Sequence, residues 1–348
     1  MRKRAILALL AAGLVLVLGL GAAALVLFGS DDPVQRAEPR ATPTPTPTSS
    51  APPKPKPPQR SLLSGRLGRK DGPLLAVKID NTGAAHPQAG LAKADVVYIE
   101  QVEGGVTRLV ALYSSELPKT VAPVRSARIT DIELLRQYGT VGLAYSGAQK
   151  KLVRKLKRSK YLRLASFDES RRGYTRSPAR PMPYDVIGYP RTLLQRVGKV
   201  DRPTRVGYSF GAAPAGGRAA HHVTVQYPGA RVDAVWSAAR KRWMLAMDGR
   251  ADRAAEGGQL GPTTFVVQYV TVTRSAYHDF RGSNTPFSST VGSGKALIFR
   301  DGRVYQAAWS RWKPSQPTAY SIGGKRAVFA PGQVWVALVA KNRPARVS

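Results

Sequence analysis

The sequence contains no cysteine. This absence excludes disulfide bonds, a thiol nucleophile, cysteine metal ligands and the lipid-acceptor cysteine that anchors a bacterial lipoprotein. The folded part must therefore be held together by its apolar core. Hydrophobic residues make up 43% of the 348 positions, which is enough for two domains once an anchor and a linker are set aside.

Acidic residues and histidines are scarce. There are 21 Asp and Glu against 54 Lys and Arg, a formal net charge of +33, and only 4 histidines. This excess of cations predicts attraction to polyanions such as nucleic acid, anionic lipid headgroups or phosphate-bearing wall polymers. None of the histidines forms a His-x-x-x-His pair with an acidic partner. Neither a metal site nor a cofactor is therefore expected.

Charge is also missing from one long stretch near the N-terminus. Residues 5–28 form an uncharged apolar run of 24 residues, preceded by three cations and followed by Asp31 and Asp32. As a helix it would be about 36 Å long, enough to cross a hydrocarbon core of about 30 Å. The positive-inside rule makes residues 1–29 a cytoplasmic stub and transmembrane anchor, with the rest outside. A cleaved signal peptide, whose apolar region is usually about 7–15 residues, is the alternative, and it exports the folded part as well.

Residues 30–61 have too few large apolar side chains to form a core. The stretch from Pro33 to Arg60 is rich in Pro, Thr, Ser and Ala, a composition that predicts an extended polyproline-II linker. At about 3.1 Å per residue its 28 residues reach roughly 85 Å. That length suits a spacer that lifts a domain off a membrane.

Strand-like and helix-like patterns alternate in residues 62–206. Short apolar runs predict buried strands; they are residues 74–79, 96–99, 109–113 and 141–145. Helical spacing of apolar residues predicts helices over residues 127–138 and 149–160, of which the second is very basic. We therefore expect an α/β N-terminal domain with a mixed (α+β) sheet.

Glycine and alanine dominate residues 207–220, which predicts a connector between two domains. In residues 221–343 most patterns are strand-like, and a smaller β-rich C-terminal domain is expected there. The predicted strands are residues 222–227, 232–236, 263–273, 296–300, 304–309 and 334–339. Asp301-Gly302 between two of these runs predicts a tight hairpin, because this pair accepts positive φ angles.

Because acidic residues are few, Glu100 and Glu103 stand out at the end of one predicted strand and at the start of a Gly-Gly loop. Two carboxylates about 5 to 9.5 Å apart serve as acid and base in glycoside cleavage. The alternative is that both form ion pairs with Arg108, Arg125 or Arg128 and stabilise the loop. Ion-pair networks bring charges together as active sites do, and we favour the ion pairs over catalysis.

Arg125, Ser126 and Arg128 lie at the start of the helix predicted over residues 127–138. Ser126 suits the N-cap of this helix, which would leave backbone N–H groups and two guanidinium groups close together. Such donors bind phosphate or carboxylate groups, including the side chains of the two glutamates. A ligand contact and a structural ion pair are both open at these arginines.

Several linked motifs occur in order between residues 74 and 339. They are residues 75–81 (LAVKIDN), 86–91 (HPQAGL), 94–98 (ADVVY), 103–108 (EGGVTR), 123–128 (PVRSAR), 291–296 (VGSGKA), 301–302 (DG), 309–311 (WSR) and 331–335 (PGQVW). Together they resemble the YerB-like family of bacterial envelope proteins, often lipoproteins, with paired N- and C-terminal domains of unknown function. The resemblance implies an α/β N-terminal domain, a β-rich second domain and an envelope location. It supplies no established catalytic residues. Since this chain has no cysteine, its anchor should be the protein helix.

We therefore expect a single-pass protein of the plasma membrane, with its N-terminus in the cytoplasm and its folded domains outside. Its expected role is the non-catalytic binding of an anionic cell-wall polymer, lipid headgroups or an envelope protein partner. The expected ligand-binding residues are Asp80, Asn81, Glu100, Glu103, Arg108, Arg125, Ser126 and Arg128. An enzyme that acts on cell-wall glycan through Glu100 or Glu103 is the alternative. Nucleic acid fits the charge but not the compartment.

Overall fold

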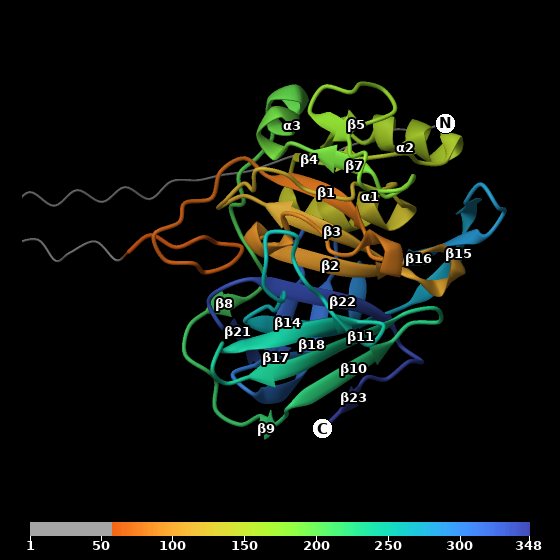
Figure 1. Cartoon of the computed structure of the whole chain (residues 1–348). Helices are drawn as coiled ribbons and strands as arrows, with labels where there is room; N and C mark the ends of the chain where they lie inside the picture. Colours follow the sequence, from red (N-terminus) through yellow and green to blue (C-terminus); the bar gives the residue numbers. More distant parts are fainter. Residues whose placement is uncertain (1–57) are drawn as a thin grey trace, which may run out of the picture. The chain divides into compact units, whose positions relative to one another are not determined.

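The computed structural model of the protein describes residues 58–348 (Figure 1). The expected transmembrane anchor and all but the last few residues of the expected linker lie outside the described residues. Within residues 58–348 no helix is long and apolar enough to cross a membrane.

A 12-stranded mixed sheet runs through the described chain. Its strands in spatial order are β20 (Lys325–Arg326), β19 (Ala319–Ile322), β18 (Arg303–Arg311), β17 (Gly292–Arg300), β14 (Thr264–Val270), β22 (Val334–Ala340), β2 (Val96–Gln101), β3 (Thr107–Tyr113), β1 (Leu75–Asp80), β4 (Val141–Tyr145) and β5 (Leu162–Ser166), with β9 (Arg218–Ala219) beside β18. We call residues 58–206 the N-terminal half and residues 207–348 the C-terminal half. The sheet takes strands from both.

Strand β22 joins the two halves. It pairs in parallel with β14 on one side and with β2 on the other, and Figure 1 shows the blue β22 beside the orange β2. Without β22, each of these neighbours would expose a long apolar edge of unpaired backbone groups, which is an aggregation hazard. The two halves therefore depend on the same central strand.

The remaining elements surround this sheet. A five-stranded sheet contains β13 (Arg250–Ala251), β12 (Arg242–Met247), β11 (Arg231–Ser237), β10 (His222–Gln226) and β23 (Arg346–Val347). Three two-stranded pairs are β15 (Val272–His278) with β16 (Asn284–Ser288), β8 (Ser209–Phe210) with β21 (Val328–Phe329), and β6 (Tyr174–Arg176) with β7 (Val186–Gly188). The helices are α1 (Ile129–Leu135), α2 (Lys150–Arg158), α3 (Pro190–Val197) and the 3-10 turns η1 (Gly83–Ala85), η2 (Leu91–Lys93), η3 (Glu103–Gly105) and η4 (Arg136–Tyr138).

Both faces of the long sheet are covered by apolar cores. On one face Leu75 packs in the core that contains Leu193 of α3 and Trp243 of the five-stranded sheet. On the other face Ala76 packs in the core that contains Leu134 of α1 and Leu152 of α2. Because successive side chains of a strand point to opposite faces, a strand covered on both sides is buried throughout. Polar residues of β1 on the α1 face are consequently buried too.

The structure confirms the strands and helices expected from the sequence, at or close to the expected residues. The helix expected over residues 127–138 consists of α1 followed by η4, and that over residues 149–160 is α2. The Asp301-Gly302 turn joins β17 and β18 with φ angles of 49° and 68°, as a primed hairpin turn requires. One expected strand, residues 263–273, is divided at Thr271 into β14 and the first strand of a separate hairpin.

The fold class needs a correction. The mixed sheet expected for the N-terminal half is present. The described chain is nevertheless mostly β, because its three α-helices have only seven, nine and eight residues. The residues of the expected connector, 207–220, add the short strands β8 and β9, and β9 pairs with β18. In space the two parts of the chain share one sheet, because hydrophobic pattern specifies that a strand exists but not which strand lies beside it.

Candidate functional site

Charged residues form a row across three strands on the α1 face of the sheet. Glu100 of β2 is in register with Arg108 of β3, and Arg108 is in register with Asp80 of β1. Lys78 lies two residues before Asp80 and therefore shares its face. Strand register thus gathers residues that are up to 30 positions apart in the sequence.

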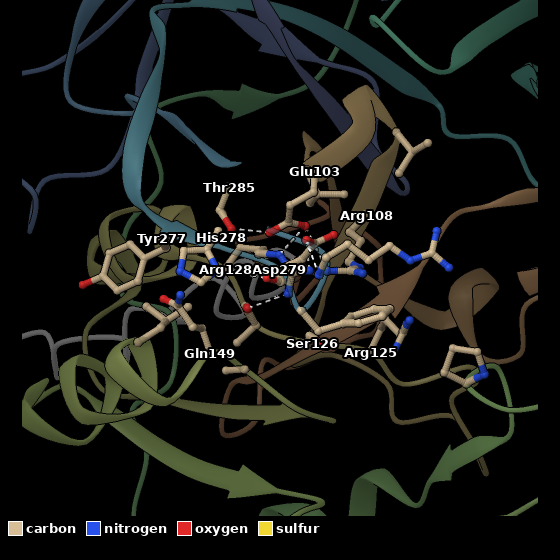
Figure 2. Close-up of a pocket in the computed structure, with 18 of the residues that line it drawn as sticks. Glu103, Arg108, Arg125, Ser126, Arg128, Gln149, Tyr277, His278, Asp279 and Thr285 are labelled. Atoms are coloured by element: carbon tan, nitrogen blue, oxygen red, sulfur yellow. Dashed lines mark hydrogen bonds and ion pairs between the residues drawn. The ribbon is translucent and has the colours of Figure 1, made fainter. Parts of the chain in front are cut away.

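A cavity of about 700 Å³ lies beside Arg108, the middle member of this row. Figure 2 shows side chains from η3, β3, the loop before α1 and the β15–β16 hairpin meeting around it. Its charged lining residues are the cations Arg108, Arg125, Arg128, Lys150 and Arg281 and the anions Glu103 and Asp279. Five cations against two carboxylates give the lining a formal charge of +3, which favours an anionic ligand.

Glu103 is held by both halves of the chain. Nε and Nη2 of Arg128 donate to the same Glu103 oxygen at 2.8 and 2.7 Å, and the Thr285 hydroxyl donates to the other oxygen. Burial alone would raise the pKa of Glu103, but the charge and hydrogen bonds of Arg128 outweigh it and the pKa lies below its usual value. Glu103 is therefore an ionised structural anchor for Arg128 and the hairpin.

Asp80 is held in a similar way by Arg125. Nε of Arg125 donates to one Asp80 oxygen at 3.0 Å, and the other oxygen accepts the backbone N–H and the hydroxyl of Thr82 at 2.8 and 2.6 Å. Burial opposes ionisation, yet the arginines and Thr82 keep the pKa of Asp80 below its usual value. Asp80 and Glu103 thus already have arginine partners.

Arg108 lies between these two pairs and, among the described residues, makes only longer contacts with their carboxylates. Its Nε is 3.7 Å from Asp80 and its Nη1 is 3.9 Å from Glu103, too far for hydrogen bonds. Among the described residues neither nitrogen has a hydrogen-bond partner, although Arg108 is only 9% exposed. Burial, followed by the charge of Arg128, lowers the pKa of Arg108 to about 10. A buried guanidinium group with unused donors is costly, and an anion in the cavity would satisfy it. We call Arg108, Arg125 and Arg128 the three-arginine cluster.

Two predicted site residues are placed differently from the others. Asn81 points away from the cavity, where its amide donates to Thr107 at 2.8 Å and accepts from Gln88 at 3.0 Å. Ser126 lines the cavity, but its predicted role as the N-cap of the helix is wrong. The helix begins at Ile129 with Arg128 as N-cap, because the Asp131 carboxylate accepts the Arg128 backbone N–H at 2.6 Å.

Glu100 does not line the cavity. Its side chain is fully buried and accepts a hydrogen bond from Lys78, whose ammonium group also donates to Asp131 at 2.8 Å. Burial, reinforced by the charge of Asp131, raises the pKa of Glu100 to about 7. We call Lys78, Glu100 and Asp131 the buried triad. It connects β1, β2 and α1, and it keeps Glu100 from facing Glu103 across a bound substrate.

Glu100→Gln is expected to change how stability depends on pH. The pKa of Glu100 is raised by folding, so the stability that its protonated form supports is present near pH 4.5 and is lost as the pH rises through about 7. Glutamine mimics the protonated carboxyl. The variant should match the parent near pH 4.5 and exceed it by roughly 1–3 kcal/mol at pH 8. Urea unfolding at both pH values measures this, and a difference that does not vary with pH contradicts it.

Several residues of the site were missed in the sequence. Thr285 and residues 277–281 reach the cavity from a hairpin about 175 to 180 positions after Glu103, and no element was predicted for these residues, because the expected strand ended at residue 273. Lys78 carried a usable signal, since a lysine within an apolar run of a strand buried on both faces requires a carboxylate partner. No group of three or more His, Asp or Glu arranged to hold a metal occurs in the described part of the chain.

Comparisons with known proteins agree on one family. The model "Protein of unknown function (DUF3048) N-terminal domain" matches residues 63–202, and the corresponding C-terminal domain matches residues 223–336. The Bacillus subtilis (strain 168) protein named "Putative lipoprotein YerB" is 25% identical over 287 residues, which are 79% of this chain and 83% of that protein. The crystal structure of YerB from Bacillus subtilis has the same fold, with a TM-score of 0.71 at 21% identity over 83% of this chain and 99% of that one.

Proposed function

We propose a function from the premise that this chain belongs to the DUF3048 family and carries its N- and C-terminal domains in order. The protein is an envelope protein whose cavity binds an anionic group. The expected ligand is a carboxylate or phosphate group of a cell-wall polymer, and it is bound without catalysis. The observation that carries the proposal is Arg108, a buried guanidinium group with unused donors at the cavity.

Two observations support the envelope location. The relative from Bacillus subtilis is named as a lipoprotein, and this chain has an apolar run of 24 residues near its N-terminus. The chain has no cysteine that could carry a lipid, so a protein helix would replace the lipid as its anchor. The folded part would then face the wall, where phosphate and carboxylate groups are abundant.

The chemistry of the cluster supports binding of an oxyanion. Planar guanidinium groups donate two parallel hydrogen bonds to a carboxylate or a phosphate, and such charge-assisted bonds are about twice as strong as neutral ones. Arg125 and Arg128 are oriented by Asp80 and Glu103, whereas Arg108 is free to contact a ligand. Arg125 and Arg128 would position the oxyanion, and Arg108 would supply most of the binding free energy.

The geometry gives less support to a glycan-cleaving enzyme. Cleavage needs one carboxyl group that holds a proton and a second one on the other side of the bond. Glu103 lines the cavity but is ionised by Arg128, and Glu100, which holds a proton more readily, is buried in the triad. Release of muropeptides from purified wall by the parent protein, and its loss in Glu103→Gln, would favour the enzyme over our proposal.

Arg108→Gln is expected to weaken binding about tenfold or more. A hydrogen bond to a charged group contributes about 1.5–3 kcal/mol, and about 1.4 kcal/mol corresponds to a factor of ten. The stability of the variant should change little, because the gain from removing a poorly paired buried cation is offset by the loss of the charge that most lowers the pKa of Asp80. The full chain in neutral detergent can be tested for co-sedimentation with purified cell wall and, by calorimetry, for binding of tripolyphosphate.

The matched control is Arg191→Gln, an exposed arginine of α3 outside the cavity. It removes the same charge and should leave both measurements within about twofold, because an exposed distant charge is screened. If Arg108→Gln binds both probes as tightly as the parent, the three-arginine cluster is not the binding site.

A further inference from the structure

Helix α2 carries a stripe of four exposed cations. Lys151, Arg154, Lys155 and Arg158 are exposed and follow one another at positions i, i+3, i+4 and i+7, which places them on one face of the helix. On the opposite face Leu152 and Leu156 are buried in the core. We call these four residues the α2 stripe.

The charges of the α2 stripe repel one another. Like charges three or four residues apart destabilise a helix, and the α2 stripe contains four such pairs. None of its members has a carboxylate partner among residues 58–348. In that part of the chain the only α2 cation in an ion pair is the neighbouring Lys157, which contacts Glu169 at 2.7 Å. The repulsion is thus not relieved within the described residues, and a polyanion on this face would relieve it.

The α2 stripe begins where the cavity ends. Gln149, the N-cap of α2, and Lys150, its first residue, both line the cavity of the three-arginine cluster, and Figure 2 shows Gln149 at its wall. The hairpin tip, where Phe280 is 90% exposed, lines the same cavity. In Figure 1 α2 and the β15–β16 hairpin project at the same side of the described chain. Cavity and stripe therefore form one continuous cationic surface.

We propose that this continuous surface binds a linear polymer that carries phosphate groups at repeated intervals. One phosphate occupies the three-arginine cluster, and the following ones lie along the α2 stripe. This inference rests on the proposed function and adds to it the polymeric nature of the ligand and its path. Each cation of the stripe then adds an intramolecular contact, so affinity grows with chain length.

Two features of α2 favour a phosphate-bearing polymer without stacked bases over a membrane surface or a single-stranded nucleic acid. Helices that dock on membranes insert an apolar face, whereas the apolar face of α2 is occupied by the protein core. Grooves for single-stranded nucleic acid stack bases on aromatic side chains, and α2 contains none. The exposed face of α2 carries only cationic side chains, and the adjacent cavity has room for one phosphate group.

The test compares tripolyphosphate with long-chain inorganic polyphosphate on the full chain in neutral detergent. The parent should bind the long chain more tightly and with a steeper dependence on salt, because more cations take part. The variant Lys151→Gln/Arg154→Gln/Lys155→Gln/Arg158→Gln should lose about tenfold or more in affinity for the long chain, with tripolyphosphate binding kept within about twofold. Its thermal stability should rise, because four repulsive pairs are removed.

The matched control removes four exposed cations of the C-terminal half. This variant, Arg218→Gln/Arg240→Gln/Lys325→Gln/Lys341→Gln, has the same change in net charge. Within residues 58–348 none of the four residues forms an ion pair or lines the cavity. Its affinity for long-chain polyphosphate should stay within about twofold of the parent. An equal loss in both variants would mean that only net charge matters, and the proposed path would be wrong.

The outcomes separate this inference from the proposed function. If the α2 variant keeps full affinity for the long chain while Arg108→Gln loses it, the cluster binds the ligand but the α2 stripe does not. If Arg108→Gln keeps affinity for tripolyphosphate, the proposed function itself fails. Loss of binding to phosphatidylglycerol vesicles by the α2 variant, with polyphosphate binding unchanged, would assign the stripe to a membrane surface and overturn the polymer.

Discussion

Lys78→Met is expected to destabilise the protein by about 3–5 kcal/mol. The ammonium group of Lys78 is fully buried and donates to Glu100 and to Asp131. Methionine fits the space of the aliphatic stem but leaves two carboxylates side by side in an apolar interior, where neither can be hydrated. Urea unfolding followed by circular dichroism at neutral pH measures the loss. The loss should shrink at acidic pH, where Glu100 binds a proton.

A triple variant distinguishes the loss of charge balance from the loss of packing. In Lys78→Met/Glu100→Gln/Asp131→Asn the whole buried triad is neutral, and such replacements are often close to neutral for stability. We expect it to recover most of the loss, since the side-chain amide introduced by Asp131→Asn keeps a carbonyl oxygen that can accept the Arg128 N–H. If Lys78→Met unfolds within about 1 kcal/mol of the parent, the triad is not the interaction that holds α1 to the sheet.

Trp335→Ala is expected to cost about 3–5 kcal/mol, the range for a buried tryptophan or phenylalanine. Trp335 is fully buried near the start of β22, in register with Phe265 of β14 and Val97 of β2. Its indole N–H donates to Gln333 at 2.8 Å. Because β22 pairs with a strand from each half, the loss should weaken both halves together. Native-state hydrogen exchange should therefore show lower protection in β3 and in β18 alike.

Trp312→Ala is the matched control for this variant. Trp312 is 70% exposed, so its truncation removes little buried surface and should change stability by less than about 0.5 kcal/mol. If Trp335→Ala lowers protection in β18 while β3 is unaffected, the two halves unfold independently. The shared sheet would then not couple them.

The positions of single elements could be predicted well from the sequence, while their neighbours could not. Residues 141–145 form the predicted strand, and Asp301-Gly302 forms the predicted turn, because hydrophobic pattern and turn chemistry act over a few residues. The place of β22 between β14 and β2 depends on contacts between segments more than 60 residues apart. No local pattern encodes such a pairing.

The candidate site was predicted in part. Asp80, Glu103 and the three arginines meet as expected, since they lie on adjacent strands or in the loops that follow them. Glu100 leaves this group because a buried lysine on the next strand but one competes for it. Thr285 joins the group through a hairpin of the C-terminal half, which no spacing between motifs could indicate.

The sequence by itself determined the properties that depend on composition and short-range order: the excess of cations, the absence of thiols, the strands and the basic amphipathic helix. Tertiary structure alone decided which charges neutralise one another and which stay free. The reason is that an ion pair depends on distances of a few ångströms between side chains of different strands. Arg108 is without a close partner because two neighbouring arginines lie nearer to the carboxylates it could have used.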